Sequence, residues 1–155
     1  MQTVKLFVLC FSLFLLFTSS GQLEQSVHWK AELVKCTGNE YSLQFSAVVS
    51  KNWRIYSLEN SQFSSTPLMT LQLEPSESFG LSDRIKEHGT VIQNLDPVFH
   101  RPLKWYEGSV LFTQKIKPIS SEGRVKGKII FVSANDHEAS TPEEFTFELK
   151  FNTKN

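Results

Sequence analysis

The apolar residues of this chain recur at every second position, which is the periodicity of a β-strand with one buried face. Thr37-Gly38-Asn39 separates the first two such segments and is typical of a turn. No long segment shows a helical period. The sequence therefore predicts an all-β protein that begins with a β-hairpin. The alternating apolar residues of this hairpin are Val27, Trp29, Ala31 and Leu33, then Tyr41, Leu43, Phe45, Ala47 and Val49.

Further strands are predicted between turn and loop signals along the rest of the chain. They cover residues 53–58, 68–74, 109–117, 124–133 and 145–151, with two short strands around His88-Gly89. Polar loops are predicted at 59–67, 75–80, 118–123 and 134–143, and a crossover or hairpin arm at 96–103. Segment 124–133 is apolar on both faces, which indicates a central strand. About eight or nine short strands favour an antiparallel β-sandwich, with a closed barrel as the alternative.

The first 21 residues have the three-part layout of a secretory signal peptide. Residues 1–5 carry one positive charge, residues 6–17 are an apolar run, and small residues at 18–21 offer a cleavage site after Gly21. The run is shorter than the roughly 20 residues that a membrane-spanning helix needs. We expect a signal peptide at 1–21 and one exported domain at 22–155 with no membrane span; an uncleaved N-terminal anchor is the alternative.

Cysteine and charge content restrict the chemistry of the exported domain. Cys10 lies in the leader, so Cys36 would be the single cysteine and no internal disulfide could form. Stability would come from the core, for which nine Phe, three Trp and three Tyr remain. Loss of Lys5 leaves 15 basic against 16 acidic residues, a net charge of −1. Such a balance gives no long-range attraction to nucleic acid.

Four short motifs follow one another along the exported domain. Together they resemble the N-terminal domain of the DsbD family of membrane thiol:disulfide interchange proteins. In that family the matching elements are Gly-Trp-x-x-Tyr-Ser, Asp-x-x-Phe, an aromatic-Glu-Gly sequence and a Cys-Asn-Asp-x-x-Cys loop before a proline. The motifs here are Asn52-Trp53-Arg54-Ile55-Tyr56-Ser57, Asp96-Pro97-Val98-Phe99, Trp105-Tyr106-Glu107-Gly108 with Phe112-Thr113-Gln114-Lys115 after it, and segment 131–142.

The resemblance implies an immunoglobulin-like sandwich in the periplasm or cell envelope of a bacterium. In that family two loop cysteines pass electrons from a membrane partner to oxidised proteins, by attack of a thiolate on a disulfide. The corresponding positions here are Ala134 and Ala139, which have no sulfur. Because the chain ends at Asn155, before the family's membrane and thioredoxin-like regions, it is expected to act alone or with a separate protein. The resemblance thus implies the fold and a degenerate redox site.

The loop between the two alanines contains the expected binding residues. Asn135 and Asp136 are expected to brace the loop through backbone amides, as such side chains commonly do. His137 is the third expected binding residue. Asp136, His137 and Glu138 are consecutive, whereas metal sites gather ligands from spaced positions. No metal or cofactor is therefore expected.

Phe63 is a further expected binding residue, in the Ser-rich segment 59–67. By the resemblance, this segment corresponds to the cap that packs an aromatic ring over the family's redox site. Phe63 would then cover Ala134 and Ala139, and the space beneath it would be a small apolar hollow or part of the core.

Three functions stay open at this point. The first is a redox-inactive binding or scaffold module, which binds a cell-envelope protein such as a thioredoxin-like or membrane reductase through residues 134–142 or a sheet edge. The second is thiol exchange with a partner reductase through Cys36, although a buried, inert cysteine fits the sequence equally well. The third is a small-ligand or metal carrier. A hydrolase is not favoured, because Ser133 and Ser140 flank His137 without a Gly-x-Ser-x-Gly elbow.

Overall fold

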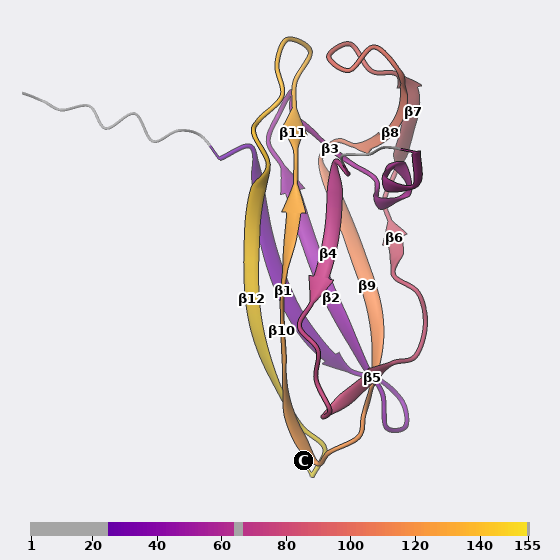
Figure 1. Ribbon diagram of the computed structural model, residues 1–155, viewed down its shortest axis with the longest axis vertical. Coiled ribbons are helices and arrows are strands. Elements are labelled where there is room, and N and C mark those ends of the chain that lie inside the picture. Colours follow the sequence, from indigo (N-terminus) through magenta and orange to yellow (C-terminus); the bar gives the residue numbers. More distant parts are fainter. Residues whose placement is uncertain (1–24, 64–66, 155) are drawn as a thin grey trace, which may run out of the picture.

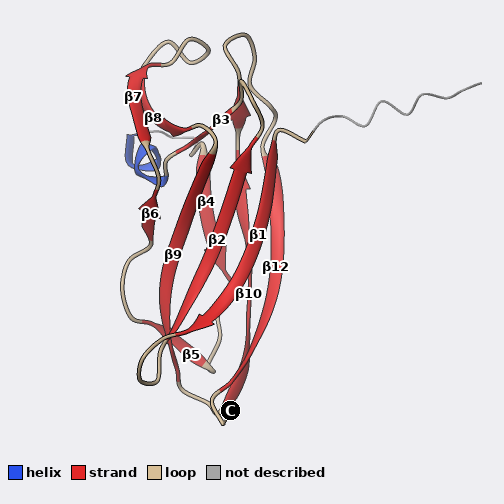
Figure 2. Ribbon diagram, turned by 180° about the vertical axis from the view of Figure 1, so that it is seen from behind, coloured by secondary structure: helices blue, strands red, loops and turns tan. Residues whose placement is uncertain are grey.

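The computed structural model describes residues 25–63 and 67–154, with the backbone alone for residues 61–63. This part of the chain contains twelve strands, one 3₁₀ helix and no α-helix (Figure 2). It has no helix long and apolar enough to cross a membrane. The predicted signal peptide at 1–21 lies outside the described residues. The all-β class that the alternation predicts is confirmed.

Two antiparallel sheets form the body of a sandwich, and a third sheet extends it at one end (Figure 1). The first sheet has the order β1 (Val27–Lys35), β2 (Tyr41–Val49), β9 (Ser109–Pro118), with β5 (Phe79–Leu81) and β6 (Lys86–His88) both beside β9. The second has the order β12 (Glu143–Asn152), β10 (Glu122–Phe131), β4 (Met69–Leu73). The third has the order β11 (Ser133–Ala134), β3 (Arg54–Tyr56), β8 (Pro102–Tyr106), β7 (Val91–Leu95).

Aromatic side chains fill the space between the first two sheets. The rings of Phe45 in β2 and Phe147 in β12 lie 4.7 Å apart between centroids. Trp29 in β1 packs against Phe112 and Phe145 at 5.8 and 6.0 Å. Each of these rings belongs to the alternating set, because alternate side chains of a strand share one face. The core is thus built by the period of two seen in the sequence.

The long predicted elements match the structure. β1 and β2 pair from Val27 with Val49 to Lys35 with Tyr41, which confirms the first hairpin. Gly38 in its turn has a φ of 78°, a conformation that glycine adopts without steric cost. β10 is the central strand of its sheet, as its two apolar faces predict, and β6 and β7 lie on either side of Gly89.

The short elements differ from the predictions. β5 begins inside the predicted loop 75–80, and β8 begins inside segment 96–103, whose first residues form a hairpin turn. The predicted loop 59–67 contains the 3₁₀ helix η1 (Leu58–Phe63). A strand of two or three residues is too short to show an alternation, so the sequence predicts fewer strands than the structure has.

The loops at the third sheet lie together at one end of the molecule. The β11–β12 and β7–β8 loops both project from the upper end in Figure 1, and the β1–β2 turn lies at the lower end. A second, smaller hydrophobic cluster lies beneath the upper loops. Its buried members are Tyr56, Leu68, Leu103, Trp105, Val132 and Ala134.

Candidate functional site

Ala134 and Ala139, at the base of the β11–β12 loop, form an isolated antiparallel bridge. The amide of Ser140 donates to the carbonyl of Ser133 at 2.8 Å, and the amide of Asn135 donates to the carbonyl of Glu138 at 3.0 Å. These bonds flank the alanines, so the alanines are a non-hydrogen-bonded pair, whose Cα atoms lie about 4.5 Å apart. This spacing falls in the range that a disulfide spans. The structure thus brings the two predicted redox positions together.

Asn135 braces the turn between the alanines, as predicted. Its Oδ1 accepts hydrogen bonds from the amides of His137 and Glu138 at 2.8 and 3.0 Å. Asp136 has a different role from the predicted one. Its Oδ1 accepts from Arg54 Nη2 at 2.9 Å, while the side chain is 76% exposed. The turn is therefore held by Asn135 from within and by Arg54 from the neighbouring strand.

Arg54 lies beneath this turn and is almost wholly buried. Its Nη2 also donates to the carbonyl of Asn135 at 2.5 Å. Its Nε lies 3.5 Å from Asp96 Oδ2 and has no hydrogen bond within the described residues. The guanidinium carbon lies 5.2 Å from the ring centroid of Trp105, in cation–π contact. A buried charge needs such compensation, because its desolvation costs several kcal/mol.

Asp96 is the fully buried partner of Arg54. Its Oδ1 accepts from the amides of Val98 and Phe99 at 2.9 and 2.8 Å, and its Oδ2 accepts from the Tyr56 hydroxyl at 2.9 Å. Burial, followed by the neighbouring carboxylate, raises the pKa of Tyr56 above its usual 10.0. The hydroxyl therefore stays protonated and continues to donate to Asp96. This network links β3 to the starts of both upper loops.

Arg54 and Asp96 were not predicted as site residues. The alternation treats β3 as a strand with one solvent face, but all three of its residues are buried, because β11 and β8 flank it and the loops cover it. One signal was present in the sequence: Arg54 lies between Trp53 and Ile55 in an otherwise apolar strand. A charge in that setting is either exposed or paired, and the pairing partner is more than 40 residues away.

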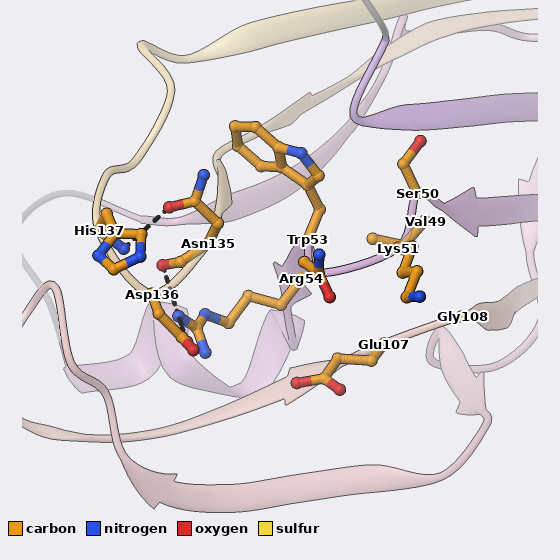
Figure 3. A pocket seen from close by; sticks show the side chains of 11 residues that line it. Val49, Ser50, Lys51, Trp53, Arg54, Glu107, Gly108, Asn135, Asp136 and His137 are labelled. Carbon is orange, nitrogen blue, oxygen red and sulfur yellow. Dashed lines mark hydrogen bonds and ion pairs between the residues drawn. The ribbon is translucent and has the colours of Figure 1, made fainter.

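A cleft of about 880 Å³ opens beside the braced turn (Figure 3). The β2–β3 turn, the β8–β9 turn and the β11–β12 loop form its walls. Its lining is polar and contains both signs of charge, from the cations Lys51 and Arg54 and the anions Glu107 and Asp136. The volume lies in the range of ligand sites, which are usually more apolar. The full lining is Val49, Ser50, Lys51, Asn52, Trp53, Arg54, Glu107, Gly108, Asn135, Asp136 and His137.

Two further predicted site residues are Phe63 and Cys36. Phe63 ends η1, but its side chain lies outside the described residues, so its cover over the alanines stays a prediction. Cys36 is half-buried in the β1–β2 turn, at the other end of the molecule, with its Sγ 3.8 Å from the carbonyl of Val34. Among residues 25–63 and 67–154, no group of three or more His, Cys, Asp or Glu side chains is placed to hold a metal ion.

No family model matches this chain, and no curated protein matches its sequence. Two solved structures share its fold. The N-terminal periplasmic domain of ScsB from Proteus mirabilis has a TM-score of 0.53 and 12% identity, over 84% of this chain and 47% of that chain. The N-terminal domain of DsbD from Neisseria meningitidis, in its reduced form, has a TM-score of 0.53 and 10% identity, over 80% of this chain and 86% of that chain.

These similarities confirm the immunoglobulin-like β-sandwich. The chain has the fold of the DsbD N-terminal domain. It spans about half the length of the ScsB structure that it matches, 47%. At 10–12% identity the similarity extends to the fold alone.

Proposed function

We propose that this chain is an exported recognition module of the cell envelope, which binds another envelope protein without thiol chemistry at residues 134 and 139. The observation that carries the proposal is the alanine pair. Ala134 and Ala139 stand side by side where a disulfide would fit, at the base of a loop that the structure holds in place. Alanine can neither attack a disulfide nor resolve a mixed disulfide.

The support of the loop favours a role for its shape. Arg54 contacts both Asn135 and Asp136, and its charge is compensated by the buried Asp96. Loops that are positioned by a rigid scaffold commonly carry binding residues. His137 and Asp136 are exposed at the tip, beside the polar cleft. A protein partner with complementary charges could contact both signs of charge there.

The fold supports a proposal for the class of partner. The domains that share this fold are described as parts of ScsB and DsbD. We propose a thioredoxin-like or membrane reductase of the same envelope as the partner of this chain, bound at the β11–β12 loop. In this arrangement the chain would hold or position its partner and would not exchange electrons with it.

Site-specific photo-cross-linking in cells of the source organism tests the proposal. A photoreactive residue replaces His137 in one variant and Asn39, an exposed residue of the opposite turn, in the control. We expect a defined protein adduct at position 137 and none at position 39. Identical adducts at both positions, or none at 137, would contradict binding through the loop.

Thiol exchange through Cys36 is the second function to be weighed, because the thiol is only half-buried. One thiol can form a mixed disulfide but cannot resolve it. The β1–β2 turn, which contains Cys36, lies at the end of the sandwich opposite the braced loop (Figure 1). If Cys36→Ser removes the adduct formed at position 137, the thiol takes part in binding. That result would favour thiol exchange over recognition without thiol chemistry.

A further inference from the structure

β7 is the outermost strand of the third sheet, and both views show it at the edge of the molecule (Figures 1 and 2). Four of its five residues are exposed. Two of them are large and apolar: Val91 is 47% exposed and Leu95 is 61% exposed. β7 pairs only with β8, so its outer edge has no strand beside it within the described part of the chain.

Three other edge strands, β1, β12 and β4, are protected in ways that β7 is not. β1 and β12 each carry several charged residues along their length, which is a common protection of sheet edges against pairing. β4 is uncharged, but only one of its five residues is exposed. β7 has the sequence Val-Ile-Gln-Asn-Leu, with no charge and no proline. An exposed, uncharged edge of this kind is a template for a further strand.

The register shows which backbone groups point outward. The amide of Asp96 donates to the carbonyl of Arg101, next to the pairing of Leu95 with Pro102. Hydrogen-bonded pairs alternate along an antiparallel ladder, so Ile92 and Asn94 bond to β8. The N–H and C=O groups of Val91, Gln93 and Leu95 therefore point away from the sheet.

These three outward residues form a self-complementary pattern about Gln93. An antiparallel copy of β7, related by a two-fold axis at Gln93, would place Val91 opposite Leu95 of the second copy and Gln93 opposite Gln93. The apolar side chains of Val91 and Leu95 would then contact each other, and so would the side-chain amides of the two Gln93 residues. We propose that two copies of this chain associate through β7, in a continuous antiparallel sheet across the two-fold axis. Such an interface is isologous and closes at two copies.

Asn94 limits the strength of this association. Its Oδ1 accepts a hydrogen bond from the amide of Leu95 at 2.8 Å, which occupies one of the outward donors. The side chain must turn away before the second copy can pair. A five-residue edge also buries less area than a standard interface. The dimer is therefore weak and depends on concentration, and Asn94→Ala strengthens it.

Analytical ultracentrifugation of the chain, purified after export, tests the proposal at concentrations up to about 1 mM. Gln93→Lys places two like charges opposite each other at the axis and weakens the dimer roughly fivefold or more. Gln93→Glu does the same. An equal mixture of the two variants restores association, because opposite charges now meet at the axis. Gln93 is exposed, so neither variant disturbs the core.

Gln72→Lys is the matched control, since Gln72 is the exposed residue of β4, which is also an uncharged edge strand. It leaves the dimer unchanged. A chain that stays monomeric up to about 1 mM overturns the proposal and leaves the β7 edge for a strand of another protein. A dimer that resists both Gln93 variants, or that is lost in Gln72→Lys, also overturns it. The proposal is independent of binding at the β11–β12 loop.

Discussion

Arg54 and Asp96 place opposite charges where the protein excludes water. The Arg54 side chain is 6% exposed and that of Asp96 is fully buried. Either charge alone would be strongly destabilising, because the neutral groups around it compensate a buried charge less well than its counter-ion does. Asp96 starts the β7–β8 loop, and Arg54 reaches the carbonyl of Asn135 in the β11–β12 loop. One ion pair thus supports both loops of the proposed binding end.

Removal of either Arg54 or Asp96 alone should lower the free energy of unfolding. We expect Arg54→Met to lower the free energy of unfolding by about 3–5 kcal/mol, because Asp96 stays buried without its cation. Addition of Asp96→Asn should recover part of the loss, since the uncompensated charge is then gone. Urea unfolding followed by tryptophan fluorescence measures both. Arg124→Met, which breaks an exposed pair with Glu148, is the control and should cost less than about 1 kcal/mol. Equal losses at positions 54 and 124 would contradict the assigned role.

The alanine pair offers a direct test of its own geometry. In the double variant Ala134→Cys, Ala139→Cys a disulfide should form in air, because non-hydrogen-bonded neighbours lie within its span. The closed loop is short, so the gain in the free energy of unfolding should be about 2 kcal/mol. Thiol titration and thermal unfolding with and without reductant measure the bond and its effect. Two titratable thiols that persist at these positions in the folded, oxidised variant would show that the pairing is different.

At the scale of elements, the sheet β12-β10-β4 depends on a close approach at Gly127. This residue lies in the central strand β10, opposite Leu73 of β4 and Phe147 of β12. A Cβ atom at this position would overlap the backbone carbonyl oxygen of Gln72. A glycine within a strand often marks such a close approach of another backbone. The pairing of β4 with β10 therefore requires glycine here.

Gly127→Ala should destabilise the protein by about 1–3 kcal/mol, because backbone atoms of β4 would have to move. Gly80→Ala is the matched control in strand β5, where a Cβ atom would meet nothing within 4 Å. It should leave the midpoint of thermal unfolding unchanged or slightly higher. Calorimetry compares the two variants. If both lose the same stability, the general properties of glycine would explain the result and the close approach would not.

The elements could be predicted from the sequence in proportion to their length. β1, β2, β9, β10 and β12 have nine or ten residues each, enough to repeat the alternation several times. β5 and β11, which were not predicted as separate strands, have three and two residues. Their extended backbone is imposed by neighbouring strands, which a local pattern cannot report. Arg54 was not predicted as a site residue for a similar reason, because its burial depends on segments that are distant in the sequence.

At the scale of the whole molecule, the two ends of the sandwich are separate surfaces. The β11–β12 loop, which contains the braced turn and borders the cleft, lies at the upper end, whereas the β1–β2 turn, which contains Cys36, lies at the lower end (Figure 1). The long strands of both sheets run between these ends. A bulky group at one end should therefore not reach the other.

Attachment of a polyethylene glycol maleimide to Cys36 should leave cross-linking from position 137 unchanged. The modification adds bulk only at the lower turn, whose backbone is closed by the bond from the Cys36 amide to the Glu40 carbonyl at 2.9 Å. Adduct yield with and without modification is the measurement. A reduced yield would place the binding surface at the lower end or along the length of the sandwich.

Alternation and turn residues were sufficient to predict an all-β sandwich, because both depend on residues close together in the chain. The cysteine count predicted that residues 22–155 form no internal disulfide. That Ala134 and Ala139 occupy the positions of a redox pair was implied only by the resemblance to the DsbD N-terminal domain, and it stays a prediction. Tertiary structure decided that these alanines are neighbours, that Arg54 is buried against Asp96, and that no strand among the described residues pairs with the outer edge of β7. Those features depend on which distant segments pack together, and no local pattern carries that information.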